Sequence, residues 1–341
     1  MSGSSLTLGD VGEREIVRTI VPRFCALAGD DCACLDLSSS KIVVTTDPVP
    51  EPAAKLLGND PDPYWMGWLL VTINASDLAA AGATPIGFVA AVEAPPSLLV
   101  SDFERLFQGI ADACRLEDMT FAGGNLREGT TLGAVGTAVG KTDRPCLRRS
   151  GAKTGDILVS IGTGGLFWRD VLTIKQGGYL SDKNSSPLFR PRSQSRAMRA
   201  LFTENAVAAA IDNSDGLLPS ADQLASINGL QANIDLEKLV VYGAEKLGVD
   251  PARLWLGWGD WNVVAAVHPG TYQRAAELCK QSGFSFIRIG EMGEGTTSVR
   301  VTRNGKTQIA PRLESERFAK DSWFKTGVQS YLDLLLTVPL P

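Results

Sequence analysis

The chain has 341 residues, of which 44% are hydrophobic and 21% are charged, and its formal net charge is −5. The length predicts about two domains, and the acidic balance excludes a dedicated nucleic-acid binder, because no basic stripe is available to meet a phosphate backbone. No apolar stretch is long enough to span a bilayer, and the N-terminus lacks the pattern of a signal peptide. We therefore expect a cytoplasmic protein with no membrane association.

The first half of the chain alternates between helical and strand patterns. The expected elements are a helix over 8–24, a strand over 41–46 that ends at Asp47, a helix over 64–81, a strand over 86–92, a helix over 101–115 with Ser101 as its N-cap, and strands over 119–122 and 132–139 around the pair Gly123–Gly124. Such mixing of helices and strands is typical of an α/β fold.

A polar and basic stretch at about 143–153 predicts a domain boundary, with an N-terminal domain over 1–145 and a C-terminal domain over 150–335. Beyond it we expect a strand over 156–161, a glycine turn over 162–165, a loop over 177–192, helices over 195–209 and 217–227, a strand over 263–268, a helix over 271–282, a strand over 284–289, and a hairpin of strands 299–302 and 306–309. The second domain is therefore also expected to be α/β.

The cysteines and the single histidine offer few catalytic arrangements. Six cysteines are dispersed, and only Cys32 and Cys34 lie close together, so the sequence matches no zinc framework. For this pair the pattern favours two small apolar core residues, and a reactive thiol stays open as an alternative. His268 follows an apolar run and precedes Pro-Gly, which favours a structural position at a strand end over a catalytic one.

Acidic and amide side chains recur where strands or glycine turns end. They are Asp30, Asp31, Asp47, Asp77, Asn125, Asp212, Asp215 and Asp260. Taken singly, each fits an ordinary turn. Magnesium prefers oxygen ligands and leaves coordination sites for phosphate oxygens, so together they predict a site that holds Mg²⁺ and the phosphates of ATP. The sequence contains no P-loop, dinucleotide-binding or protein-kinase motif.

Several motifs resemble those of thiamine-monophosphate kinase and occur in that family's order along almost the whole chain. They are AGDDCA at 28–33, VVTTD at 43–47, NASDLAAAGATP at 74–85, AGGN at 122–125, RSGAKTGD at 149–156, IDNSDGL at 211–217 and GWGDW at 257–261. The stretch 74–85 is the most specific of these. The motifs are also similar to the wider superfamily that includes aminoimidazole ribonucleotide synthetase and selenophosphate synthetase.

The resemblance implies a two-domain α/β (α+β) fold, whose N-terminal sheet pairs with its twin in a homodimer and whose inter-domain cleft holds ATP and Mg²⁺. The implied metal ligands are Asp30, Asp47, Asp77, Asp212 and Asp215, of which Asp47, Asp212 and Asp215 would be catalytic. The implied nucleotide-binding residues are Thr46, Gly123, Gly124, Asn125, Arg149 and Ser214, and Asp260 and Trp261 would line the acceptor pocket. The implied reaction is direct transfer of the γ-phosphoryl group of ATP to a phosphate oxygen.

The chain departs from the family pattern at three places. Asn125 stands where the family has Asp, the stretch after Asp47 has neither the histidine nor the phenylalanine of the family, and 257–262 reads GWGDWN, with fewer acidic residues and added tryptophans. Because pocket lining sets substrate choice, the small-molecule acceptor could be thiamine monophosphate or another metabolite. Two alternatives stay open: ATP-dependent activation of a carbonyl or amide oxygen with C–N bond formation, and a non-catalytic nucleotide-binding scaffold.

Overall fold

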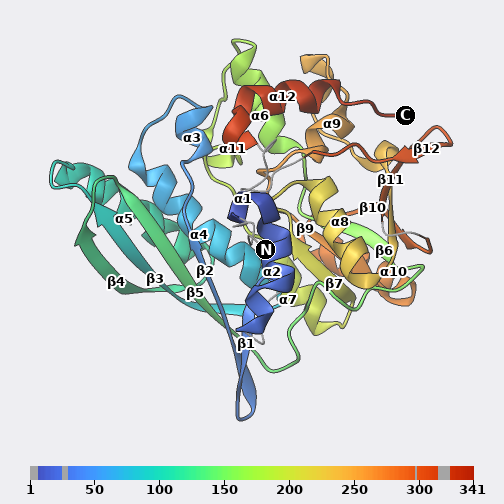
Figure 1. Ribbon diagram of the computed structural model, residues 1–341, viewed down its shortest axis with the longest axis horizontal. Helices are drawn as coiled ribbons and strands as arrows, with labels where there is room; N and C mark the ends of the chain where they lie inside the picture. Colours follow the sequence, from blue (N-terminus) through green and yellow to red (C-terminus); the bar gives the residue numbers. More distant parts are fainter. Residues whose placement is uncertain (1–6, 25–29, 296–297, 314–322) are drawn as a thin grey trace, which may run out of the picture.

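The computed structural model describes residues 7–24, 30–295, 298–313 and 323–341, and its strands form two sheets (Figure 1). The first sheet contains β1 (Ala33–Leu37), β2 (Ser40–Pro48), β3 (Thr84–Ala94), β4 (Thr120–Glu128) and β5 (Gly133–Thr142), in the order β1-β2-β5-β3-β4. The pairs are antiparallel except for β3 with β4, which are parallel. β4 is therefore an edge strand, two strands away from β5 and three from β2.

Helix α4 (Pro63–Ala80) packs between the two halves of the molecule. Its side chains are buried around most of its circumference, as expected of a helix that is apolar on all sides. It contacts β2 and β5 of the first sheet, and α7 (Ser195–Thr203) and β7 (Val207–Asp212) of the second half. α5 (Val100–Leu116) lies very close to it, because a Cβ on Gly67 would stand 2.0 Å from the Leu106 carbonyl oxygen. The two glycines Gly67 and Gly109 thus permit this helix pair.

The second sheet is mixed and carries helices on both faces. Its strands are β6 (Ile157–Ile161), β7, β8 (Gln231–Asp235), β9 (Val263–Val267), β10 (Phe286–Gly293), β11 (Ser298–Arg303) and β12 (Lys306–Ile309), in the order β12-β11-β8-β10-β6-β9-β7. Its helices include α6 (Leu166–Lys175), α8 (Leu217–Asn228), α9 (Pro251–Leu256) and α10 (Pro269–Ser282). β9 is buried at every position, which explains its continuous apolar run.

The remaining short elements lie at the periphery. They are α1 (Leu8–Val11), α2 (Glu13–Thr19), α3 (Ala53–Leu56), α11 (Trp323–Thr326) and α12 (Val328–Thr337), with 3₁₀ turns at Val21–Arg23, Lys183–Ser185, Leu236–Lys238 and Ala244–Leu247. α1 and α2 stand beside α8 in Figure 1. Within the described ranges, no helix is both long enough and apolar enough to cross a bilayer.

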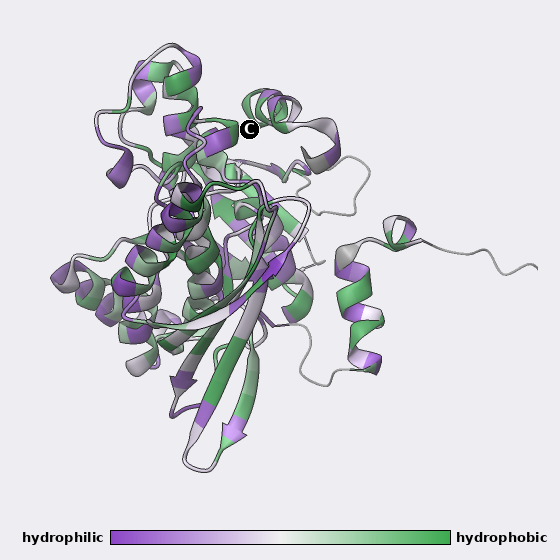
Figure 2. Cartoon of the chain, turned by 90° about the vertical axis from the view of Figure 1, so that its left-hand side faces the viewer, coloured by the Kyte–Doolittle hydropathy of each residue, from purple (hydrophilic) through white to green (hydrophobic). Residues whose placement is uncertain are grey.

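One face of the first sheet packs on α4, and the opposite face is partly exposed. Side chains alternate along β3, so that Phe88 and Ala90 are buried while Val89 is 39% exposed. Val135 on β5 is 42% exposed in the same way. Hydrophobic residues, green in Figure 2, run along these strands. We call the side that carries Val89 and Val135 the open face of the first sheet.

Three local expectations from the sequence are wrong. The helix expected over 195–209 ends at Thr203, and the short apolar run that follows becomes strand β7, because a run without periodicity fits either state and pairing with β9 decides it. The N-cap of α5 is Leu99 rather than Ser101. Gly123 and Gly124 lie inside β4 and not in a turn between strands.

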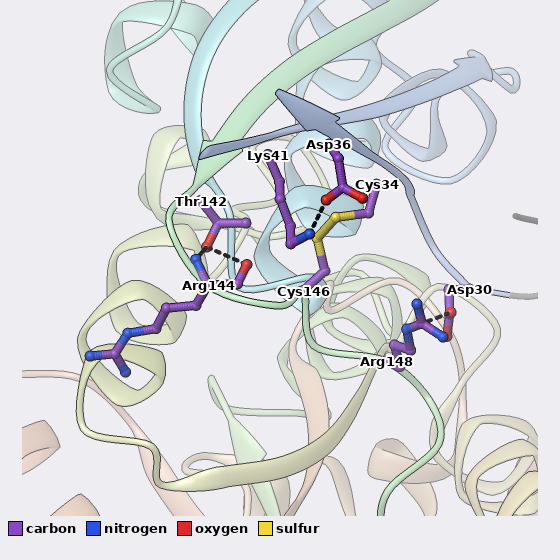
Figure 3. The surroundings of a disulfide bond; sticks show 8 residues. All are labelled: Asp30, Cys34, Asp36, Lys41, Thr142, Arg144, Cys146 and Arg148. Carbon is purple, nitrogen blue, oxygen red and sulfur yellow. Dashed lines mark hydrogen bonds and ion pairs between the residues drawn. A yellow bond between two sulfur atoms is a disulfide. The ribbon is translucent and has the colours of Figure 1, made fainter. Parts of the chain in front are cut away.

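A disulfide bond joins Cys34 on β1 to Cys146 in the connection between the two sheets (Figure 3). The interpretation of Cys32 and Cys34 as two free core residues is therefore wrong for Cys34, whereas Cys32 is a buried free thiol. The partners are 112 residues apart, and spacing alone does not reveal connectivity. Cys25 lies outside the described residues.

Candidate active site

A cavity of about 640 Å³ lies between the two sheets. One end carries the carboxylates of Asp30, Asp31, Asp47, Asp77, Asp212 and Asp215, which we call the carboxylate end. Another part is lined by the rings of Trp65, Phe167, Phe189, Trp258 and Trp261, which we call the aromatic wall. Residues from both halves of the chain contribute to both parts, so the cavity forms only when the two halves pack together.

The carboxylate end brings together side chains that are far apart in the sequence. Asp31 precedes β1, Asp77 lies in the last turn of α4, and Asp212 is the last residue of β7. Each of these three offers an oxygen, and the oxygens lie within 4.8 Å of one another. Asp47, near the end of β2, and Asp215, just before α8, line the same cavity. The five predicted metal ligands and Asp31 thus share one site.

The electrostatics of this cluster favour a bound cation. Burial raises the pKa of Asp77 well above its usual value, and the neighbouring carboxylates of Asp212, Asp47 and Asp31 raise it further. Burial is also the main cause of the raised pKa of Asp212, followed by the charge of Asp31. Close carboxylates that resist ionisation together are an all-oxygen donor set, which fits Mg²⁺.

Arg149 enters the cluster as its counter-charge. Its guanidinium donates to Asp31 Oδ1, and its other terminal nitrogen donates to Gln223 Oε1 at 3.0 Å. Burial raises the pKa of Asp31, and Arg149 opposes that shift. The backbone N–H of Arg149 also donates to Asp30 Oδ1 at 3.0 Å, and Figure 3 shows Asp30 beside Arg148, near the disulfide. Arg149, which was expected to bind the nucleotide, therefore lines the cavity, and its guanidinium is paired with Asp31.

Hydroxyl groups support two of the carboxylates. Thr45 Oγ1 donates to Asp77 Oδ2 at 2.6 Å, and Ser214 Oγ donates to Asp212 Oδ1 at 3.2 Å. The predicted Thr46 also lines the cavity, but its side chain lies on the other face of β2 and donates to the Gly136 carbonyl at 2.9 Å. Thr45 was missed, although the alternation of side chains along a strand allows only one of two neighbours to reach Asp77.

The loop that carries Asp212 and Ser214 rests on a buried polar network. Asn213 Nδ2 donates to Asn262 Oδ1 at 2.8 Å, and Asn262 Nδ2 donates to Ser160 Oγ at 2.6 Å. Ser220 Oγ donates to Asn213 Oδ1 at 3.0 Å. Fully satisfied buried networks hold backbone segments in one arrangement. Asn262, a departure from the family pattern, thus stabilises the loop that follows Asp212.

Some predicted residues lie away from the cavity. Gly123, Gly124 and Asn125 are in the edge strand β4 and are not among the lining residues. A Cβ on Gly124 would stand 1.8 Å from the Ala90 carbonyl oxygen, so glycine here permits the pairing of β4 with β3. Within one chain, these three residues do not join the carboxylate end.

Asp260 and Trp261 have different surroundings. Asp260 accepts hydrogen bonds from the backbone N–H groups of Gly165 at 2.6 Å and Phe167 at 2.8 Å, at the start of α6. Burial raises its pKa to about 7, opposed by these hydrogen bonds. Trp261 lines the cavity, and its φ of 53° is an unusual conformation for a bulky residue. Strain of this kind clusters at functional sites.

The sequence motifs did not identify much of the remaining lining. Arg14 and Arg18 of α2 reach the cavity, as do Trp65 of α4 and the segment 187–191. That segment is fixed to α4, because Trp68 Nε1 donates to the Pro191 carbonyl at 2.8 Å and the guanidinium of Arg190 stacks 3.9 Å from the centroid of the Trp68 ring. No local pattern in a Gly- and Pro-rich loop predicts such docking.

Two family models match the chain: the N-terminal domain of AIR synthase related protein over residues 29–142, and the C-terminal domain over 153–302. The chain is 32% identical over 240 residues to the thiamine-monophosphate kinase of Caulobacter vibrioides, covering 66% of this chain and 67% of that one. It is 28% identical over 269 residues to the enzyme of that name from Aquifex aeolicus, covering 77% and 86%.

Solved structures show the same fold. A thiamine-monophosphate kinase from Stenotrophomonas maltophilia aligns with a TM-score of 0.69 and 26% identity, covering 80% of this chain and 87% of that one. AaThiL complexed with AMPPCP and TMP aligns with a TM-score of 0.73 and 24% identity, covering 90% and 99%. The two-sheet architecture and its order of elements are therefore those of a known fold.

Proposed function

The chain belongs to the AIR synthase related family as an ATP-dependent kinase similar to thiamine-monophosphate kinases, and from this premise we propose that it transfers the γ-phosphoryl group of ATP to a small-molecule acceptor in the cavity, with Mg²⁺. The observation that carries the proposal is the convergence of Asp31, Asp77 and Asp212 within 4.8 Å at one end of that cavity. Carboxylates so arranged are suited to cations that bind phosphates.

The residues of the carboxylate end have distinct roles in this proposal. Asp30, Asp47, Asp77, Asp212 and Asp215 would hold Mg²⁺, which when bound neutralises the negative charge of the triphosphate. Thr45 orients Asp77, and Ser214 orients Asp212. Arg149 supplies a fixed positive charge beside the carboxylate of Asp31. Direct transfer needs no covalent enzyme intermediate, so positioning and charge neutralisation suffice.

The acceptor would lie against the aromatic wall. Indole and phenyl rings offer flat apolar surfaces, on which a planar heterocycle can stack. Thiamine monophosphate has such rings and is the acceptor named by the relatives of this chain. We propose it as the first acceptor to test. Other phosphorylated compounds with a planar ring are the next class.

The open face of the first sheet supports a homodimer. Half-exposed Val89 and Val135 would become buried if the sheet packed against the same sheet of a second copy. The edge strand β4, with Gly123 and Asn125, borders this face. Val135→Asp is expected to give a monomer by light scattering where the parent chain gives a dimer. A parent chain that is monomeric at micromolar concentration would contradict this part of the proposal.

The central experiment is a screen of phosphorylated acceptors with ATP and Mg²⁺, in which ADP, inorganic phosphate and phosphorylated product are measured separately. Phosphotransfer gives ADP and a new diphosphate, without free inorganic phosphate. ATP-dependent C–N bond formation would release inorganic phosphate, and a scaffold would give neither product. Asp77→Asn should abolish turnover, whereas the exposed matched variant Asp143→Asn should keep it. Equal activity in both variants would contradict the assignment of the carboxylate end.

A further inference from the structure

Helix α12 (Val328–Thr337) lies beyond residue 302, where the match to the C-terminal family domain ends. It is nevertheless firmly docked, because Leu332 and Leu335 are buried. Arg253 of α9 donates to the Val338 carbonyl at 2.7 Å and to the Leu335 carbonyl at 3.3 Å. Figure 1 shows α12 in red, next to α6 and α9. The helix is therefore part of the folded second half, outside the region that defines the family.

From this helix, Tyr331 reaches the back of the aromatic wall. Tyr331 is 3% exposed, and its ring centroid lies 5.5 Å from that of Trp168 and 6.1 Å from that of Trp258. Trp258 in turn lies 5.0 Å from Phe167, and both of these rings line the cavity. Burial raises the pKa of Tyr331, and the charge of Asp215 raises it further, so the hydroxyl stays neutral.

The segment 257–261 also packs tightly on helix α6. A Cβ on Gly257 would stand 2.2 Å from Trp168 Nε1, and a Cβ on Gly259 would stand 2.5 Å from the Phe167 ring. Asp260 is bonded to the start of α6. The backbone of this segment thus packs closely on α6, and Tyr331 is one of the residues that contact the Trp258 side chain. Removing the Tyr331 ring would open space into which the indole could retreat from the cavity.

We propose that Tyr331 is a positioning residue for the acceptor: it holds Trp258 at the cavity surface, so that the C-terminal helix sets the shape of the acceptor side. This inference rests on the proposed function, because it takes the aromatic wall to be the place where the acceptor ring binds. It predicts an effect on the acceptor that is separate from any effect on the nucleotide.

The test compares steady-state kinetics of Tyr331→Ala, Tyr331→Phe and Tyr272→Ala with those of the parent chain, using thiamine monophosphate and ATP. Tyr331→Ala should raise the KM for thiamine monophosphate about tenfold, the equivalent of one aromatic contact, and change the KM for ATP less than about twofold. Tyr331→Phe keeps the ring and should restore the parent KM. Tyr272 is partly buried and packs on Phe286 in a core cluster away from the cavity, so Tyr272→Ala controls for loss of a packed ring.

Calorimetric binding of thiamine monophosphate gives a second readout that does not require turnover. If Tyr331→Ala does not fold, Tyr331→Leu removes the ring but leaves a smaller space, and it should raise the KM for the acceptor selectively but by a smaller factor. Equal KM values for the acceptor in the parent and in Tyr331→Ala, or a parallel rise for ATP, would overturn this inference and leave the proposed function standing. Weakened acceptor binding in Tyr331→Ala without phosphotransfer by the parent would overturn the proposed function alone. A parent chain that binds no thiamine monophosphate would overturn this inference as stated, and the proposed function would then be tested with the next class of acceptor.

Discussion

The carboxylate end and the aromatic wall face the same cavity, but different interactions hold them in place. At the carboxylate end, like charges from separate segments are brought together against their mutual repulsion, and hydroxyls such as Thr45 and a buried asparagine network hold them there. At the aromatic wall, rings pack on one another and on glycines, and the contacts that hold Trp258 are themselves favourable. We infer that the first region gives up stability for function, whereas the second supports both.

The largest expected effect breaks the carboxylate end. Asp212→Asn should lower kcat about 10³-fold, because it removes a charged group from the site that holds the phosphates. The same change relieves repulsion in the metal-free protein, so its melting temperature should stay the same or rise. Activity assays and thermal melts in chelator check both results. A large fall in melting temperature would show that the cluster is stabilising, and that the two regions do not differ in this respect.

At the aromatic wall, Phe167→Ala should lose stability by about 3–5 kcal/mol, since the ring is 2% exposed and contacts Trp168 and Trp258. Where the variant folds, its acceptor KM should rise more than its kcat falls. Urea unfolding and steady-state kinetics give the two measurements. A variant that loses kcat as completely as Asp212→Asn but keeps its stability would remove the distinction between the two regions.

Removing the disulfide tests whether a covalent link helps to hold the segments next to the carboxylate end. Replacing both Cys34 and Cys146 by serine should lower the free energy of unfolding by about 5 kcal/mol, the value for a closed loop of this length. The matched control replaces the buried free thiol Cys114 by alanine, a substitution that closes no loop. Denaturant unfolding of the oxidised parent, the reduced parent and both variants measures the difference. Equal stability of oxidised and reduced parent would contradict the prediction.

The smallest effect concerns Asp260, which anchors α6 behind the aromatic wall. Its pKa is raised from an ordinary value near 4 to about 7, so the folded protein retains a proton that the unfolded chain has already released. The contribution of Asp260 to the free energy of unfolding is therefore fully present below about pH 4, and it is lost as the pH rises toward 7. Asp260→Asn should flatten that part of the melting profile. An unchanged slope between pH 4 and 7 would assign the pH dependence to other groups.

Local signals in the sequence located the acidic residues, since the strand-end positions of Asp47 and Asp212, and the position of Asp77 in the last turn of a helix, can be read from neighbouring residues. The fold class followed from alternating helical and strand patterns. Signals of this kind do not give the order of strands in a sheet, and for that reason Asn125 was expected at the site but lies on an edge strand. Nor do they give long-range packing. The contact of Tyr331 with Trp258 and the bond between Cys34 and Cys146 depend on how distant segments meet.

The covalent link between Cys34 and Cys146 also has a consequence for the ion pair next to it. Asp31 and Arg149 lie just outside the two cysteines, on chain segments that leave the disulfide side by side. A tether this short keeps the two charges at an effective concentration of about the millimolar range or above, even when their contact is broken. A charged ligand that separated the pair would therefore leave its two partners close enough to re-form the contact rapidly.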